Sequence, residues 1–123
     1  AKMLGYKDYT TLFEGWGIGA EGFGGGTLNH AWSGGPLTLM CQKICGIEPT
    51  SPGFKTFKIS PQLGKLKRAS TSIETNYGTI SVSLVKKGSR IAADITVPQG
   101  TTAQSTVKGK PRTLAPGTHH VTI

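Results

Sequence analysis

The feature that most constrains the fold is a regular alternation of apolar and polar residues over positions 79–97. Apolar side chains occupy every second position on both sides of a Lys-Lys-Gly-Ser segment: Ile80, Val82, Leu84, Ile91, Ala93, Ile95 and Val97. A period of two places these side chains on one face of an extended chain, and the glycine-containing turn lets two strands fold back on each other. The segment therefore predicts a β-hairpin with one buried face.

Further strands are expected on both sides of this hairpin. They are predicted over residues 54–59, 101–107 and 121–123. The 123 residues include 18 Gly and 7 Pro, which favours many turns and short strands over long helices. Short strands with regular turn signals are typical of an antiparallel β-sandwich, so we assign residues 49–123 to a mainly β, sandwich-like domain.

Residues 1–48 follow a different pattern. Pro36 suits the first turn of a helix, and Gly46 suits its C-terminal stop. Between them, apolar residues recur at the spacing of one helix face: Leu37, Met40, Cys41 and Ile44. A glycine-rich loop precedes this helix, and a Pro/Gly-rich linker over residues 46–53 follows it. We therefore place a domain boundary between residues 48 and 49.

The charge also divides at this boundary. Residues 1–48 carry three Lys against four carboxylates, a net charge of −1, whereas residues 49–123 carry eleven Lys or Arg against two carboxylates, a net charge of +9. One hypothesis is therefore a basic module that binds an acidic polymer, either a nucleic acid or an acidic polysaccharide. The scarcity of aromatic residues after position 48 argues against base stacking, and the cations are expected at hairpin ends in solvent. We therefore predict no nucleic-acid partner.

A second hypothesis makes the sandwich a carbohydrate-binding module. Such modules usually present two or three exposed aromatic side chains in a row. The ring residues after position 48, apart from the histidines, are Phe54, Phe57 and Tyr77, and the two phenylalanines follow the pattern of core residues. A structural role for the sandwich is the favoured interpretation.

The cysteines and histidines do not predict a metal site or a disulfide. Cys41 and Cys45 lie four residues apart on the expected helix, where their side chains are poorly aimed for a disulfide, and we interpret them as small buried hydrophobes. His30, His119 and His120 do not have zinc-ligand spacing, and we predict no cofactor. No apolar run approaches the roughly 18 residues of a membrane span.

Aromatic and polar residues that suit a sugar site gather between positions 14 and 32. They are Glu14, Trp16, Glu21, Asn29, His30 and Trp32. The apolar faces of pyranose rings stack on tryptophan, and sugar hydroxyls bond to carboxylate, amide and imidazole groups. From composition alone, the alternative is two core tryptophans beside a solvated loop.

The order of these residues is more specific than their composition. Residues 9–16 (YTTLFEGW) and 26–36 (GTLNHAWSGGP) resemble the closing segment of bacterial α-L-rhamnosidases, which are glycoside hydrolases with an (α/α)6 barrel. The likeness continues through residues 46–57 (GIEPTSPGFKTF), 61–64 (PQLG) and 97–101 (VPQGT), where that family's barrel passes into a C-terminal β-sandwich. It covers nearly the whole chain, although the sandwich portion is less specific than the two N-terminal motifs.

The resemblance implies a reaction and a set of residues. That family hydrolyses terminal α-L-rhamnosides with inversion, using two carboxyl groups roughly 6.5–9.5 Å apart that leave room for the attacking water. By resemblance, Glu14 is the general base and His30 contacts the rhamnose ring. Trp16, Trp32 and Asn29 are expected to line the sugar pocket, whereas Glu21 is interpreted as a solvated loop carboxylate.

The chain also departs from that family in an informative way. A barrel of twelve helices does not fit, because this sequence has room for one or two, so residues 1–48 are expected to be the barrel's last segment. The family's general acid lies in an upstream segment, and catalytic geometry needs both carboxyl groups. We therefore expect this chain to be inactive by itself and to have the upstream barrel of the same polypeptide as its partner. The sandwich is expected to cover the apolar helix face of Leu37, Met40 and Ile44, and the enzyme is expected to be exported.

Overall fold

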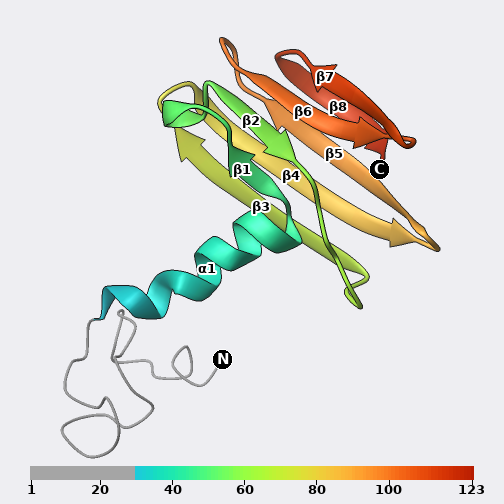
Figure 1. Cartoon of the computed structure of the whole chain (residues 1–123), viewed down its shortest axis with the longest axis horizontal. Coiled ribbons are helices and arrows are strands. Elements are labelled where there is room, and N and C mark those ends of the chain that lie inside the picture. The colour runs from blue at the N-terminus through green and yellow to red at the C-terminus, as the bar shows by residue number, and fades with distance from the viewer. Residues whose placement is uncertain (1–29) are drawn as a thin grey trace, which may run out of the picture. The chain divides into compact units, whose positions relative to one another are not determined.

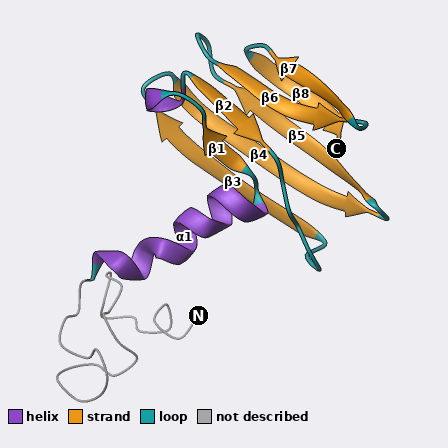
Figure 2. Cartoon of the chain, in the orientation of Figure 1, coloured by secondary structure: helices purple, strands orange, loops and turns teal. Residues whose placement is uncertain are grey.

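The computed structural model describes residues 30–123 (Figure 1). The chain divides into two units, Ala1–Leu39 and Met40–Ile123, and each is considered by itself. Among the described residues, the first unit contributes the start of a helical segment and the second contains eight strands. Figure 2 colours the helical segment and the strands along the chain.

The helical segment runs through three consecutive pieces. It begins as a 3-10 helix, Ala31–Gly34, continues as α1, Gly35–Leu39, and ends as a π-helix, Met40–Ile44. The predicted helix is confirmed and starts five residues earlier than Pro36, which lies in the first turn of α1. The Cys45 N–H donates to the carbonyl oxygen of Met40 over 3.0 Å, which widens the last turn.

Four strands form the first sheet, in the order β1-β2-β6-β7. Their bounds are Ile47–Pro49, Thr56–Ile59, Thr102–Val107 and Lys110–Leu114. β1 and β7 pair antiparallel with their neighbours, but β2 and β6 run parallel, with Phe57 opposite Ala103. This one pair is the parallel exception in a sandwich whose other strand pairs are antiparallel, as expected.

The other four strands form an antiparallel sheet in the order β3-β4-β5-β8. Their bounds are Arg68–Thr75, Gly78–Lys87, Arg90–Val97 and Gly117–Thr122. The predicted hairpin is β4 and β5, and it lies at the centre of this sheet, where both of its strands have a neighbour on each side. The mainly β sandwich class is therefore confirmed.

The core lies between the facing sheets (Figure 1). Its central side chains come from both sheets and are almost fully buried: Ile47, Phe57, Ile59, Ile80, Val82, Leu84, Ile95 and Ala103. Because Ile47 is fully buried and pairs with Ile59, the interpretation of residues 46–53 as a linker is wrong at β1. A short 3-10 turn, Pro52–Phe54, begins near the end of that segment.

The helix face predicted to lie under the sandwich is only partly covered. Ile44 packs against the core, as expected. Met40 is 54% exposed, so the expectation is wrong there, because this residue lies at the start of the π-helical piece, one turn before the core contact. Leu37 belongs to the other unit, so its expected contact with the sandwich stays a prediction.

Gly46 joins the helical segment to β1 at a point where two backbones meet. Its φ is +75°, and a Cβ added there would lie 2.2 Å from the carbonyl carbon of Ser60. The Ser60 N–H donates to the Gly46 carbonyl oxygen over 2.9 Å, which holds the two backbone segments together. Glycine is required here for both its conformation and its lack of a side chain.

This close approach yields a stability prediction with a matched control. Gly46→Ala should lower the free energy of unfolding by at least about 2 kcal/mol more than Gly88→Ala. Gly88 also has a positive φ, but a Cβ there meets open space, so the control isolates the clash with Ser60 from the backbone strain. Urea unfolding of the two variants measures the difference, and equal losses would contradict the account of Gly46.

Candidate functional site

Two of the predicted sugar-contacting residues, His30 and Trp32, lie at the start of the helical segment. His30 is half-buried in an extended conformation, and its carbonyl oxygen accepts a hydrogen bond from the Ser33 N–H over 3.1 Å. The imidazole meets the Trp32 ring edge-on, with ring centroids 5.8 Å apart and an interplanar angle of 72°. The two rings therefore lie in contact at the start of the helical segment, and their role in sugar binding stays a prediction.

Trp32 is not a core residue. Its side chain is 87% exposed, the largest exposure among the big apolar residues of the part that the structure describes. The alternative of two core tryptophans is therefore wrong for Trp32. Glu14, Trp16, Glu21 and Asn29 lie outside the described residues, so their assignments stay predictions.

The carboxylates of the sandwich unit do not form a catalytic pair. Glu48 on β1, Glu74 on β3 and Asp94 on β5 occupy three different strands. Glu74 accepts two contacts from the Thr79 hydroxyl, at 2.8 and 3.0 Å, and Asp94 lies 2.6 Å from the His120 ring. Because inverting hydrolysis needs two carboxyl groups facing one water, these three offer no such site.

The remaining carboxylate, Glu48, is engaged by lysine. The Lys43 ammonium donates to Glu48 over 2.6 Å, and this bond, with the Lys43 and Lys58 charges, holds the pKa of the Glu48 carboxyl below its usual value. A carboxyl with a lowered pKa is a poor proton donor at neutral pH. Glu48 therefore does not fit the role of a general acid.

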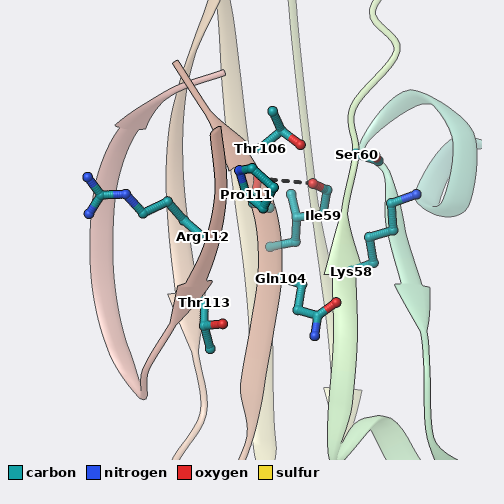
Figure 3. Close-up of a pocket in the computed structure, with 9 residues that line it drawn as sticks. Lys58, Ile59, Ser60, Gln104, Thr106, Pro111, Arg112 and Thr113 are labelled. Carbon is teal, nitrogen blue, oxygen red and sulfur yellow. Dashed lines mark hydrogen bonds between the residues drawn. The ribbon is translucent and has the colours of Figure 1, made fainter. Parts of the chain in front are cut away.

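A pocket of about 310 Å³ lies along β2, β6 and β7. Figure 3 shows Lys58 and Gln104 side by side on adjacent strands, with Thr113 near them and Arg112 directed away. The Ser105 hydroxyl at its floor donates to the Ile59 carbonyl oxygen over 3.0 Å. These groups can form hydrogen bonds to a polar molecule, but the pocket contains no carboxylate for acid–base chemistry.

A second pocket, of about 360 Å³, lies over β3, β4 and β5. Its lining is dominated by small hydroxyl side chains, with Asp94 as the single carboxylate. No buried side-chain nitrogen or oxygen among residues 30–123 lacks a hydrogen-bond partner. The same residues contain no group of three or more His, Cys, Asp or Glu that could hold a metal ion.

The two cysteines are free thiols. Cys45 is buried in the core, which confirms its interpretation as a buried hydrophobe, and burial, together with the nearby Cys41, raises the pKa of its thiol. Cys41 is only half-buried, and its sulfur lies 3.3 Å from the Thr71 hydroxyl oxygen. The buried Cys45 thiol therefore does not lie in a setting that favours the nucleophilic thiolate.

The family assignment rests on a match to residues 46–122, which covers more than half of the chain. The matching family model is that of the bacterial alpha-L-rhamnosidase C-terminal domain. The chain belongs to this family. The match begins at the glycine that precedes β1 and ends with the last residue of β8, so it spans the eight strands found in residues 30–123.

Two relatives found by sequence comparison are named alpha-L-rhamnosidase. The chain is 34% identical over 101 residues to an alpha-L-rhamnosidase of Formosa agariphila and 38% identical over 101 residues to one of Alteromonas sp.. Each match covers 77% of this chain and 11% of the relative. The chain thus spans about a ninth of the curated relatives that it matches.

Solved structures show the same fold. An alpha-L-rhamnosidase from Aspergillus terreus superposes with a TM-score of 0.70 at 26% identity, covering 79% of this chain and 12% of its own. The enzyme from Dictyoglomus thermophilum gives a TM-score of 0.71 at 18% identity, with coverage of 92% and 16%. The Streptomyces avermitilis enzyme, solved with L-rhamnose, gives 0.69 at 20% identity, with coverage of 81% and 12%.

The different environments of Cys41 and Cys45 predict that a thiol reagent modifies them at different rates. At neutral pH a maleimide should modify Cys41 well before Cys45, because Cys45 is buried and the raised pKa of its thiol keeps it protonated. Time-resolved mass spectrometry of the folded Cys41→Ser and Cys45→Ser variants measures each thiol alone. Faster labelling of Cys45 would contradict the burial of residue 45 against the core.

Proposed function

We propose that this chain is the C-terminal part of a larger α-L-rhamnosidase that hydrolyses terminal α-L-rhamnosides with inversion. The observation that carries the proposal is the family match over all eight strands, joined to two relatives of that name at 34% and 38% identity. The short span of each relative that the chain covers supports a role as one segment of a longer enzyme. A rhamnose-containing glycan is then the substrate of the whole enzyme, and an exported location suits such a substrate.

The sandwich has a structural role in this proposal. Its described carboxylates are dispersed and its buried polar side chains are satisfied, so it supplies no catalytic pair. The helical segment instead exposes large apolar side chains: Trp32, Leu37, Leu39 and Met40. Exposed apolar side chains on one short segment favour burial against another part of the protein, and the upstream catalytic barrel is the proposed cover. By itself the chain is then inactive.

The proposed chemistry assigns the base to this chain and the acid to the upstream barrel. Glu14 takes a proton from a water molecule that attacks the anomeric carbon from the face opposite the leaving group. The upstream acid donates a proton to the glycosidic oxygen as that bond breaks. No metal or cofactor has a part in these steps.

His30 and its neighbours position the sugar in this scheme. The imidazole of His30 bonds to a ring hydroxyl, with Asn29 beside it in sequence, and the indole rings of Trp16 and Trp32 pack against the pyranose. The edge-on contact of His30 with the exposed Trp32 supports this assignment, because both groups are accessible at the start of the helical segment.

A carbohydrate-binding role for the sandwich alone is less well supported. Phe57 is fully buried and Phe54 packs against the core, with their ring centroids 6.4 Å apart. Tyr77 is 39% exposed and is the one exposed ring, histidines aside, in residues 49–123. A row of exposed aromatic side chains is therefore missing from this part of the chain.

The test uses the full-length enzyme with and without Glu14→Gln, assayed on an aryl α-L-rhamnoside. Glutamine keeps the shape of the side chain and removes the base, so kcat should fall by roughly 10²–10⁴-fold. Glu21→Gln is the matched control and should leave kcat within about threefold, as expected for a solvated carboxylate. A wild-type enzyme that is folded but inactive on rhamnosides would overturn the substrate assignment, whereas an active Glu14→Gln enzyme would overturn only the base.

A further inference from the structure

Eight of the eleven cations in residues 49–123 lie at one end of the sandwich, which we call the basic end. Its members are exposed residues of three separate turns and the strand ends beside them: Lys65, Lys67, Arg68, Lys86, Lys87, Arg90, Lys108 and Lys110. They come from positions up to 45 residues apart in the sequence. The sequence shows an excess of positive charge, but their common location emerges only from the fold.

Strand pairing brings the three turns together. The Lys86 N–H donates to the Lys67 carbonyl oxygen over 2.8 Å, which joins the start of β3 to the end of β4. Lys87 pairs with Arg90 across the β4–β5 turn. The β4–β5 turn and the loop before β3 lie at the same end of the sheets in Figure 1.

The third turn joins this end through β8. The Lys108 N–H donates to the Thr122 carbonyl oxygen over 3.0 Å, and Thr122 pairs with Ala92 near the start of β5. Lys110 follows at the start of β7, opposite Val107. Both sheets therefore contribute cations to the basic end.

No carboxylate side chain of the described residues compensates this charge. The two ion pairs in residues 30–123 are Lys43–Glu48 and His120–Asp94, and neither includes a member of the basic end. Asp94 lies four residues along β5 from Arg90, about 13 Å at the rise of a strand, and it is already engaged by His120. The Lys86 ammonium contacts the Gly64 carbonyl oxygen over 2.6 Å, which leaves its positive charge unneutralised.

The composition of the basic end favours one class of partner. It has no aromatic side chain for stacking on bases, since Tyr77 lies at the opposite end, in the β3–β4 turn. Its apolar members are Leu66 and Val85, each 45% exposed beside the cations, which is too little apolar surface for a membrane anchor. Two aliphatic side chains among lysines and arginines suit the C–H faces of sugar rings that carry carboxylates.

We propose that the basic end binds an acidic polysaccharide, with its lysine and arginine side chains paired to carboxylates spaced along the chain. Such binding is electrostatic, needs no catalytic group and tolerates variation in the neutral part of the polymer. It goes beyond the proposed hydrolysis and does not depend on it. It would hold the protein on an acidic glycan.

The test measures binding of the 123-residue chain to polygalacturonate by isothermal titration calorimetry. Binding is expected at about 0.01 M NaCl and should be lost toward about 1 M NaCl, where the Debye length falls from about 30 Å to about 3 Å. Fully methyl-esterified polygalacturonate, which keeps the backbone without the charge, should not bind.

Matched double variants locate the binding surface. Lys65→Gln/Lys67→Gln and Lys108→Gln/Lys110→Gln remove two charges from each of two turns of the basic end, and each should weaken binding about tenfold or more. Lys55→Gln/Lys58→Gln removes the same charge elsewhere on the sandwich and should weaken binding by less than about threefold. Far-ultraviolet circular dichroism verifies that all three variants are folded.

Four outcomes would overturn the proposal. They are no binding at the lowest salt, equal binding of the esterified polymer, equal weakening by the control variant, and tighter binding to duplex DNA or to phosphatidylserine vesicles. The last outcome would assign the basic end to another class of partner. None of these measurements involves rhamnoside hydrolysis, so their failure leaves the proposed activity untouched.

Discussion

The parallel pairing of β2 with β6 is the contact on which the rest of the structure depends. Residues 60–101 leave the first sheet after β2, form three strands of the second sheet, and return to place β6 beside β2. Phe57 meets Ala103 and Ile59 meets Ser105 in this pairing, and the Ser105 hydroxyl secures the Ile59 carbonyl oxygen. Without it the first sheet would be two separate two-stranded pieces, each marginal in water, and the core would lose one wall.

Sequence could predict those elements in which apolar side chains recur at one regular spacing. β4 and β5 are central strands with one buried face, so their alternation is complete. β3 and β7 escaped prediction because both are edge strands, in which hydroxyl groups, charges and Pro111 interrupt the pattern. Such residues protect a sheet edge from further pairing, and they hide the strand from a search for apolar periodicity. The pairing of β2 with β6 could not be predicted either, because the alternation of apolar residues indicates which face of a strand is buried and not which strand lies beside it.

Sequence could likewise predict only some features of the candidate site. A motif of neighbouring residues placed His30 and Trp32 together, and the structure brings their rings into contact. The dispersal of Glu48, Glu74 and Asp94 over three strands, by contrast, depends on strand register and required the fold. The basic end could not be predicted from sequence. Composition gives a net charge of +9 for residues 49–123, but only the fold shows that three turns bring most of these cations to one surface.

The central proposal is that the sandwich has a structural role in a larger α-L-rhamnosidase and contributes no catalytic group. The most direct measurement is an assay of the purified 123-residue chain on an aryl α-L-rhamnoside, beside the full-length enzyme at equal molar concentration. A circular dichroism spectrum typical of β-sheet, with cooperative unfolding, establishes first that the chain is folded. We expect no turnover above the uncatalysed rate by the chain and full turnover by the enzyme. Hydrolysis by the folded chain alone would contradict the account, because it would require a complete acid–base pair within these 123 residues.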